Sequence, residues 1–381
     1  MKFEDFRSGS FQQQYQYKSF LPEKINREWT WNDARINVLL EQATRSLAEL
    51  NAFTLIVPDV DVFIAMHITK EANTSSRIEG ARTELNEAIL DEGEVSPERR
   101  DDWHEVRNYI EAMNDAVDEL DRLPLSLRLL RNTHSILMKG VRGESKTPGE
   151  FRISQNWIGG ASLETAAFIP PHHVEIPGLL TDLEAFWHNE DIHVPHLIRI
   201  AISHYQFETI HPFLDGNGRI GRLLIPLYLL NHGLLRKPSL YLSAYLEKHR
   251  TSYYDALSRV RESDDIGHWC RFFLEAVIET AADGKLTFQR IFALRNDIEN
   301  QVLSLGRRAE MAQRLIRHLY ARPAVTVKQT MDLLRINYNP ANSLLSALTN
   351  LGILDKVTSL RRNRLFVFSR YLDVFLDKSE T

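Results

Sequence analysis

The sequence predicts a mainly α-helical protein with one short β-hairpin in its middle and a small helix-and-hairpin domain at its C-terminal end. Three observations support this fold class. Apolar residues recur at spacings of three and four through residue 304, which is typical of amphipathic helices. Two short apolar stretches flanked by glycine and proline, "ISQNWIGG" and "AAFIPP", are typical of hairpin strands. Three short helical patterns and then an alternating stretch end the chain, which favours a winged-helix-like domain.

Amphipathic helices are predicted in order along the chain up to its basic tail. The fourth of them ends at Gly140, a helix-stop residue, and a break follows at "VRGESKTPGEFR". The segment 220–233 is apolar on every face, which indicates a helix buried inside its domain with Gly233 as its cap. The predicted helices cover residues 32–52, 60–92, 104–120, 125–140, 177–190, 195–210 and 220–233.

Charge is distributed unevenly along the chain, and this predicts a domain boundary. Residues 306–370 contain 12 Lys and Arg against 3 Asp and Glu, a net charge of +9, which leaves −14 for the rest. Helices are predicted in this tail at 309–320, 327–335 and 340–351, with Pro340 in a first helical turn. We therefore divide the chain into a helical region 1–100, a central domain 101–305 and a winged-helix-like domain 306–381.

Composition favours a soluble, cytoplasmic protein. No stretch approaches 18 uninterrupted apolar residues, and the start "MKFEDFRSGSFQQQ" lacks the pattern of a secretory signal, so no membrane association is expected. The single cysteine, Cys270, cannot form a disulfide within the chain, which fits a reducing compartment. Beside Trp269, it is expected to be a small core residue.

The stretch "HPFLDGNGRIGR" at residues 211–222 concentrates residues suited to phosphate chemistry. Gly216, Asn217 and Gly218 form a small-residue turn directly before a helix. Backbone N–H groups at a helix N-terminus are unpaired and lie at the positive end of the helix dipole, so they bind anions. Arg219 and Arg222 add fixed positive charge and bidentate donors. The turn is therefore predicted to hold a polyphosphate.

Two further side chains of the same stretch supply an acid and a base. Asp215 can hold Mg²⁺ that bridges phosphate oxygens, because magnesium prefers carboxylate and phosphate ligands. His211 can remove a proton from an attacking hydroxyl near neutral pH. A lone histidine or Gly-Asn-Gly turn is more often structural, so it is their combination that favours a functional site.

This stretch is similar to H-x-F-x-[DE]-G-N-G-R-x-x-R, the signature of the Fic (Fido) family of protein adenylyltransferases, at all eight constrained positions. The resemblance implies a Fic-type helical domain that transfers AMP from ATP to a Tyr, Thr or Ser hydroxyl of a protein and releases pyrophosphate. It also implies Mg²⁺ or Mn²⁺ as the cofactor. By position, His211 resembles the general base, Phe213 a buried anchor of the loop, and Asp215 the metal ligand. The nucleotide contacts that the resemblance implies are Gly216, Asn217, Gly218, Arg219 and Arg222.

Two other segments resemble parts of the same family. "TPGEFR" and the hairpin that ends in "AAFIPP" are similar to the flap that positions the target chain by strand pairing, which would involve Phe168 and Ile169. These two residues are equally consistent with plain core strand positions. "YLSAYLEKHRTSYYDAL" resembles the adenine-side helix, with Tyr253 and Tyr254 at the base pocket and His249 where many relatives have Asn.

The stretch "SSRIEG", residues 75–80, matches [ST]-x-x-x-E-[GN], the inhibitory-helix motif of the Fic family. The resemblance implies that an N-terminal helix, through Ser75 and Glu79, locks the site within the same chain. A Glu79 carboxylate paired with Arg222 would occupy the guanidinium needed by the γ-phosphate. The alternative is an ordinary helix end, with Glu79 solvated and Gly80 as the cap.

Other functions stay open at this level. In some relatives the glutamate helps a water molecule to remove AMP from modified targets, so a hydrolase that uses Glu79 is the closest enzymatic alternative. The basic tail favours DNA binding as a rival function, although winged helices also serve as protein-interaction or dimer modules. The candidate DNA contacts are Asn339, Asn342, Ser343, Arg361, Arg362 and Arg364. Expected partners are ATP, target proteins of unknown identity and the protein itself, with a homodimer left open.

Overall fold

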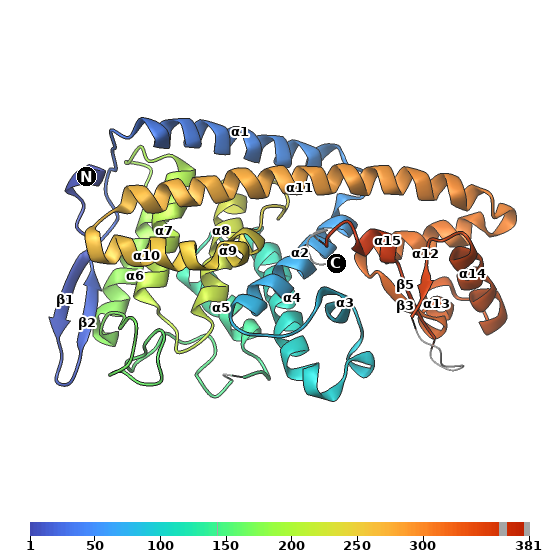
Figure 1. Ribbon diagram of the computed structural model, residues 1–381, viewed down its shortest axis with the longest axis horizontal. Coiled ribbons are helices and arrows are strands. Elements are labelled where there is room, and N and C mark those ends of the chain that lie inside the picture. The colour runs from blue at the N-terminus through green and yellow to red at the C-terminus, as the bar shows by residue number, and fades with distance from the viewer. Residues whose placement is uncertain (143, 358–363, 377–381) are drawn as a thin grey trace.

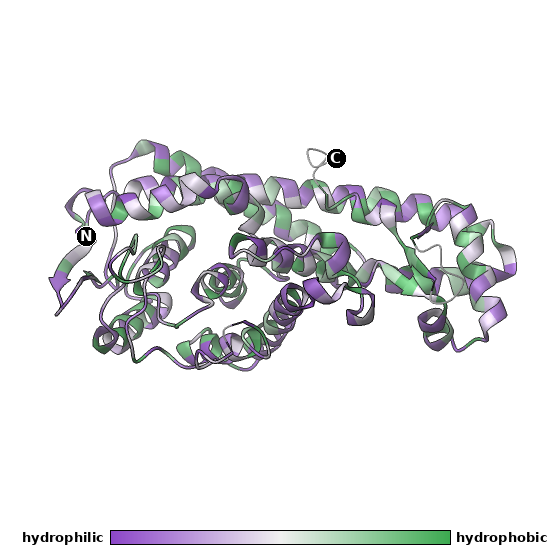
Figure 2. Cartoon of the chain, turned by 60° about the horizontal axis from the view of Figure 1, so that its bottom comes forward, coloured by the Kyte–Doolittle hydropathy of each residue, from purple (hydrophilic) through white to green (hydrophobic). Residues whose placement is uncertain are grey.

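The computed structural model describes residues 1–142, 144–357 and 364–376, and it is mostly helical (Figure 1). This confirms the predicted fold class. Two long helices, α1 (Ala34–Ile56) and α11 (Ile266–Leu303), pack side by side along one edge of an elongated molecule. Hydrophobic and hydrophilic residues alternate along both helices (Figure 2), and the buried residues of each helix are largely apolar.

Two helices form the centre of the molecule and carry the candidate site between them. Nearly every residue of α7 (His196–Ile210) and α8 (Asn217–Asn231) is buried, as predicted for the segment 220–233. Gly233, with φ of 69°, follows the end of α8. α11 and α1 pack on α7, and the other helices around this pair are α2 (Val60–Ile78), α4 (Arg100–Leu120), α5 (Leu127–Leu137) and α6 (Ile176–His188).

Shorter elements connect these helices. Cys270 is fully buried in α11, as expected for a core residue. Within the described ranges, no helix has the length and apolar content needed to cross a membrane. The shorter α-helices of this part are α3 (Leu85–Ala88), α9 (Ser243–Lys248) and α10 (Arg250–Ser263), and the 3-10 turns are Phe3–Asp5, Glu92–Glu94, Pro97–Arg99, His173–Glu175 and Gly306–Arg308.

The helix predicted at 60–92 is wrong in its extent. The structure ends α2 at Ile78, and only the short α3 follows before residue 92. Gly80 has φ of 101°, which lies outside the helical range, so the chain leaves the helix there. Glycine adopts such a positive φ without a steric penalty because it has no Cβ. This break places Glu79 at the end of α2, directly beside the centre of the molecule.

The predicted central hairpin is reduced to a single bridge between Ile158 and Phe168. Gly159 and Gly160, with φ of 67° and 72°, turn the backbone away on one side. The prolines of "AAFIPP" have no N–H to extend the ladder on the other. The expected pair of strands is therefore corrected to a loop with one bridged pair.

An N-terminal hairpin, which the sequence did not predict, covers this loop. Strands β1 (Gly9–Gln13) and β2 (Lys18–Pro22) pair antiparallel. Their sequence, "GSFQQQYQYKSFLP", has few apolar residues and no glycine at the turn, so local pattern does not mark it. Tertiary packing determines the hairpin instead, because Phe20 is buried against Phe168, with 5.8 Å between the ring centroids.

The segment 306–376, which is predicted to belong to a separate domain, contains the three predicted helices and a final pair of antiparallel strands. Its antiparallel sheet has the strand order β3-β5-β4. The domain packs on α2, where the Tyr320 ring lies 5.0 Å from that of Phe63 and Arg317 pairs with Asp59 at 2.7 Å. Its elements are α12 (Ala309–Ala321), β3 (Ala324–Thr326), α13 (Val327–Leu334), α14 (Tyr338–Asn350), β4 (Asp355–Lys356), β5 (Leu365–Val367) and α15 (Ser369–Leu372).

The residues suggested for DNA contact are partly engaged within the domain. Arg364 donates to the Asn342 side chain at 2.5 Å, and Arg308 donates to the Ser343 hydroxyl at 3.3 Å. Arg361 and Arg362 lie outside the described residues. Asn339 lies in the first turn of α14.

Candidate active site

The turn between α7 and α8 is held in shape by its own residues. His211 ends α7 in a left-handed conformation, with φ of 50°, and its N–H donates to the Phe207 carbonyl at 2.9 Å. The Asn217 side chain accepts from the Phe213 N–H at 2.8 Å and donates to the Phe213 carbonyl at 2.9 Å. Asn217 is buried, so its side chain fixes the turn and its contribution to anion binding is limited to the backbone.

His134, on α5, supports the same turn and was missed by the sequence reasoning. Its Nδ1 accepts from the Gly149 N–H at 2.8 Å, so Nε2 carries the proton and donates to the Asp215 carbonyl at 3.0 Å. The ring stacks on Phe213 with 3.8 Å between centroids. Burial lowers the pKa of His134 to about 4, so the ring is neutral. No local pattern marks a residue that acts on a turn 81 positions away.

Two more side chains that the sequence did not single out hold the backbone at His211. Arg152 donates to the His211 carbonyl at 3.0 Å, and Asn156 donates to the same carbonyl at 3.1 Å and to that of Phe213 at 2.8 Å. Both side chains are buried. Arg152 belongs to the predicted "TPGEFR" segment, which therefore acts as a brace behind the turn.

The His211 imidazole is set up as a proton acceptor. Its Nδ1 lies 3.4 Å from the Glu208 carbonyl, which can only accept, so the proton resides on Nδ1 and Nε2 is free. Burial, together with the nearby Arg152 cation, lowers the pKa of His211 to about 4. Glu208, whose carboxylate lies 4.0 Å from the ring, has its own pKa raised to about 7 by burial. The imidazole is therefore neutral at physiological pH, and its Nε2 lone pair is available to accept a proton.

Asp215 lies beside the turn with its carboxylate charged and partly open to solvent. Burial alone would raise the pKa of this carboxyl, but the bonds from Lys146 and from the Gly216 N–H lower it below its ordinary value. Lys146 Nζ lies 3.0 Å from the carboxylate, and the Gly216 N–H donates to it at 2.7 Å. The described residues contain no cluster of three or more His, Cys, Asp or Glu that could hold a metal ion by themselves. The Asp215 carboxylate, which is charged and pairs with the Lys146 ammonium, fits a Mg²⁺ ion whose remaining ligands are phosphate and water.

Arg222 is bound by residues at the C-terminal end of α2. It donates from Nη2 to Glu79 Oε1 at 2.7 Å, from Nε to the Ser75 hydroxyl at 2.8 Å and from Nη2 to the Ser75 carbonyl at 3.0 Å. The guanidinium is buried, and the neighbouring Glu79 raises its pKa against the effect of burial. Burial would raise the pKa of Glu79, but Arg222 lowers it, so both groups are charged.

The Glu79 carboxylate also contacts the N-terminal turn of α8. A Cβ atom at Gly218 would collide with Glu79 Oε1, so the carboxylate lies directly over the backbone where an anion is expected to bind. Arg219, the other arginine of the motif, pairs with the buried Glu105 at 3.3 Å. Each of the two arginines that are predicted to bind phosphate therefore faces a carboxylate of the same chain.

The residues predicted for the adenine pocket do not all reach it. Tyr253 is buried and its hydroxyl lies 2.9 Å from Nε2 of His204, so it belongs to the core beneath α8. Tyr254 is 41% exposed, and the Arg250 guanidinium lies over its ring, 5.9 Å from the centroid, so the side chain is partly accessible. His249 packs on Tyr245 at the junction of α9 and α10, with 4.4 Å between centroids.

The predicted flap residues are paired within the chain. Phe168 exchanges two backbone hydrogen bonds with Ile158, at 2.9 and 3.1 Å. The Ile169 carbonyl, which points to the other side, accepts from the Phe20 N–H of β2 at 2.9 Å. The flap hypothesis predicts that a target chain pairs with this segment. The N-terminal hairpin thus already occupies one of its backbone acceptors, the Ile169 carbonyl.

Acid is expected to destabilise the fold partly through His204. This histidine is fully buried, Nδ1 donates to the Gly221 carbonyl at 2.9 Å, and burial lowers its pKa to about 4. The ring is neutral when folded but has an ordinary pKa of about 6.5 when unfolded. Its contribution to stability is therefore complete above pH 6.5 and is lost as the pH falls toward 4. A pKa shift of this size corresponds to about 3 kcal/mol in the free energy of unfolding.

We expect the stability difference between the native protein and a His204→Gln variant to narrow by up to about 3 kcal/mol between pH 7 and pH 4. Urea unfolding at several pH values measures this difference. The matched control is His193→Gln, which replaces an exposed histidine and should give a parallel curve. Parallel curves for His204→Gln as well would show that His204 titrates normally in the fold.

Comparison with known proteins agrees with this geometry. Residues 38–118 match the Fic/DOC family N-terminal model and residues 124–229 match the Fic/DOC family model. Two relatives named Protein adenylyltransferase Fic, from Culex quinquefasciatus and Aedes aegypti, are 34% and 33% identical over 134 residues, which is 35% of this chain. The match covers 24% of each relative, so the chain spans about a quarter of their length.

Solved structures share the fold. A Fic family protein from Desulfovibrio desulfuricans G20 has a TM-score of 0.57 at 19% identity, over 90% of this chain and 98% of that one. A Fic domain containing signaling protein from Bacteroides thetaiotaomicron VPI-5482 has a TM-score of 0.53 at 18% identity, over 67% of this chain and 97% of that one. The fold is thus that of a Fic domain preceded by a helical Fic N-terminal domain. The two matches together cover just under half of the chain, and within residues 38–118 and 124–229 the chain carries the Fic N-terminal and Fic domains.

Proposed function

We propose that this protein is an adenylyltransferase that moves AMP from ATP to hydroxyl groups of target proteins and of itself. The observation that carries the proposal is the single turn that joins a neutral base at His211, the N-terminal turn of α8 and the two buried arginines, Arg219 and Arg222. The printed names of the relatives, Protein adenylyltransferase Fic, support the same activity.

The reaction follows from the groups present. His211 Nε2 takes the proton of a Tyr, Thr or Ser hydroxyl, whose oxygen attacks the α-phosphorus of ATP. The bond from that phosphorus to the bridging oxygen breaks, and pyrophosphate leaves with both electrons. The backbone at the N-terminus of α8 and the guanidinium groups of Arg219 and Arg222 hold the departing charge. A Mg²⁺ or Mn²⁺ ion held by Asp215 supplies further neutralisation of the phosphates when bound.

We further propose that α2 locks this site in the same chain. The Glu79 carboxylate occupies the anion position over Gly218 and engages Arg222, which Ser75 also holds. A triphosphate that approached this position would meet a negative charge and an arginine that is already paired. ATP is then excluded from the pose in which its γ-phosphate contacts Arg222.

Labelled ATP tests the activity directly. The purified protein, alone and with a cell lysate, is incubated with ATP labelled at either the α- or the γ-phosphorus. AMP transfer puts the α-label on protein and leaves the γ-label in pyrophosphate. Protein that retains the γ-label would identify a kinase, and protein that retains neither label, even after the Glu79→Gly change, would refute the proposal.

Replacing Asp215 by alanine is expected to abolish the Mg²⁺ dependence of ATP binding and to reduce AMP transfer by about 100-fold or more, since a metal supplies several kcal/mol of charge stabilisation. Calorimetry of ATP binding with Mg²⁺ or with chelator gives the first quantity, and the α-label assay in the Glu79→Gly background gives the second. The control is Asp118→Ala, an exposed carboxylate on α4. Undiminished transfer in chelator would contradict the metal assignment.

A further inference from the structure

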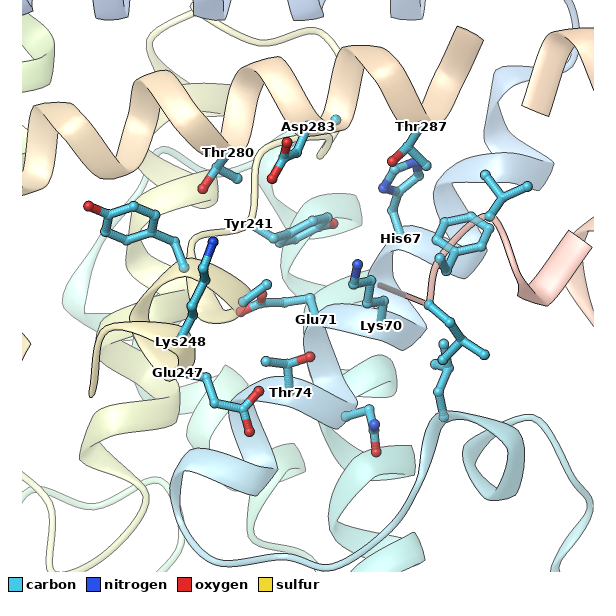
Figure 3. A pocket seen from close by; sticks show the side chains of 18 of the residues that line it. His67, Lys70, Glu71, Thr74, Tyr241, Glu247, Lys248, Thr280, Asp283 and Thr287 are labelled. Atoms are coloured by element: carbon cyan, nitrogen blue, oxygen red, sulfur yellow. The ribbon is translucent and has the colours of Figure 1, made fainter. Parts of the chain in front are cut away.

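Three glutamates are buried in the part of the chain that the structure describes, and two of them are paired. Glu71, beside the cavity shown in Figure 3, accepts from the Tyr109 hydroxyl at 3.0 Å and from the Ser243 hydroxyl at 2.5 Å. Glu105 pairs with two arginines, at 3.3 and 3.4 Å. In contrast, Oε1 of Glu208 on α7 has no hydrogen-bond partner among the described residues. Burying a carboxylate without such partners is costly, so stability does not explain Glu208.

The Glu208 carboxylate lies against the His211 ring. Its Oε2 is 4.0 Å from His211 Nδ1, the nitrogen that also lies 3.4 Å from the Glu208 carbonyl. Its Oε1 lies against α8, where a Cβ atom at Gly221 would collide with it. The carboxylate is therefore on the Nδ1 side of the ring, while Nε2 stays available to the hydroxyl of a target.

Neighbouring charges control the ionisation of Glu208. Burial raises the pKa of this carboxyl to about 7, Arg222 and Arg261 act against that effect, and Glu79 adds to it. Release of Glu79 therefore removes one cause that keeps the carboxyl protonated, so the site ionises more readily when it is unlocked. The groups that face Glu208 and His211 are Glu79 at the end of α2, Arg152 ahead of α6, Arg222 on α8, and Tyr253, Tyr254 and Arg261 on α10.

We propose that Glu208 is a positioning residue for AMP transfer, whose carboxylate stabilises the imidazolium that forms when His211 accepts the hydroxyl proton. This inference rests on the proposed function. The hydroxyl proton goes to Nε2, the Nδ1 proton stays on the ring, and the carboxylate accepts a charge-assisted hydrogen bond from Nδ1. Such contacts are often long without substrate and tighten during the reaction. After transfer Nε2 returns its proton to water, and Glu208 itself takes up none.

Glu208→Gln in the Glu79→Gly background tests this role, because glutamine keeps the shape of the side chain and cannot carry its charge. We expect kcat at about pH 8 to fall by about tenfold to 100-fold, while KM for ATP stays unchanged, since the imidazolium exists only during the reaction. The rise of kcat with pH that accompanies ionisation of Glu208 should disappear. Glu208→Asp, which keeps the charge, should restore part of that rise.

The matched control is Glu184→Gln, which removes a half-buried carboxylate that accepts from the Leu127 N–H at 2.8 Å. It should leave the shape of the pH profile unchanged. The proposal is wrong if Glu208→Gln keeps the parent kcat. It is equally wrong if kcat falls while the pH profile keeps its shape, because a structural role alone would then account for the loss.

NMR of the histidine rings gives a readout that does not need AMP transfer. The His211 ring nitrogens, assigned by their absence from the His211→Ala spectrum, are followed against pH in the full chain. Interacting groups titrate together, so these signals should show an inflection near pH 7, where Glu208 ionises, and Glu208→Gln should abolish it. A parent protein without this inflection would refute the pairing. Absence of AMP transfer in Glu79→Gly alone would instead refute the proposed function.

Discussion

Replacing Glu79 by glycine is expected to raise AMP transfer by roughly 30-fold or more, including transfer onto the protein itself. The substitution removes the carboxylate that lies 2.7 Å from Arg222 and over the N-terminal turn of α8. Truncating one partner of such a pair is worth about 2–5 kcal/mol, and each 1.36 kcal/mol is tenfold in rate. Because the Glu79 side chain is 35% exposed and partly screened, the lower end of this range applies.

Initial rates of incorporation of the α-label measure this gain. The control is Glu98→Gly, which removes an exposed glutamate far from Arg222 in the sequence. A double variant, Glu79→Gly with Arg222→Ala, should lose most of the gain, since the arginine is the group that the carboxylate and the γ-phosphate share. If Glu79→Gly leaves transfer unchanged and instead abolishes removal of AMP from a modified target, Glu79 belongs to a hydrolytic site.

Replacing His211 by alanine, in the Glu79→Gly background, is expected to reduce transfer by about 10²–10⁴-fold, the usual contribution of general acid–base catalysis. ATP affinity and the unfolding transition should change little. The bonds from Arg152 and Asn156 that hold this turn end on the His211 backbone carbonyl, which alanine retains. The imidazole itself lies 3.4 Å from the Glu208 carbonyl and 4.0 Å from the Glu208 carboxylate, and both contacts are long.

Single-turnover rates with the α-label, together with calorimetry of ATP binding, separate loss of the base from loss of the site. His193→Ala, an exposed histidine, is the matched control and should transfer AMP at the parent rate. Native-speed transfer by His211→Ala would remove this residue from the mechanism. A parallel loss of ATP binding would instead assign it to positioning of the turn.

Much of the fold could be predicted because its information is local. The helices α1, α4 to α8 and α12 to α14 carry their apolar residues at helical spacing, and the structure places helices on all of these segments. Predictions failed where the decisive contact was distant or where one residue ended an element. The N-terminal hairpin depends on Phe20 against Phe168, and the helix predicted at 60–92 ends at Ile78 because the chain leaves the helix at Gly80.

The sequence by itself determined which residues are available for chemistry: His211, Asp215 and the two arginines lie within twelve residues, and "SSRIEG" marks the helix that faces them. Only the tertiary structure decided which residues hold these groups in place and which carboxylates pair with the arginines. His134, Arg152 and Asn156 brace the turn, Glu105 pairs with Arg219, and Asn217 and Tyr253 turn inward. The physical reason is that a motif records neighbours along the chain, whereas burial, a lowered histidine pKa and a paired guanidinium arise only when segments distant in sequence pack together.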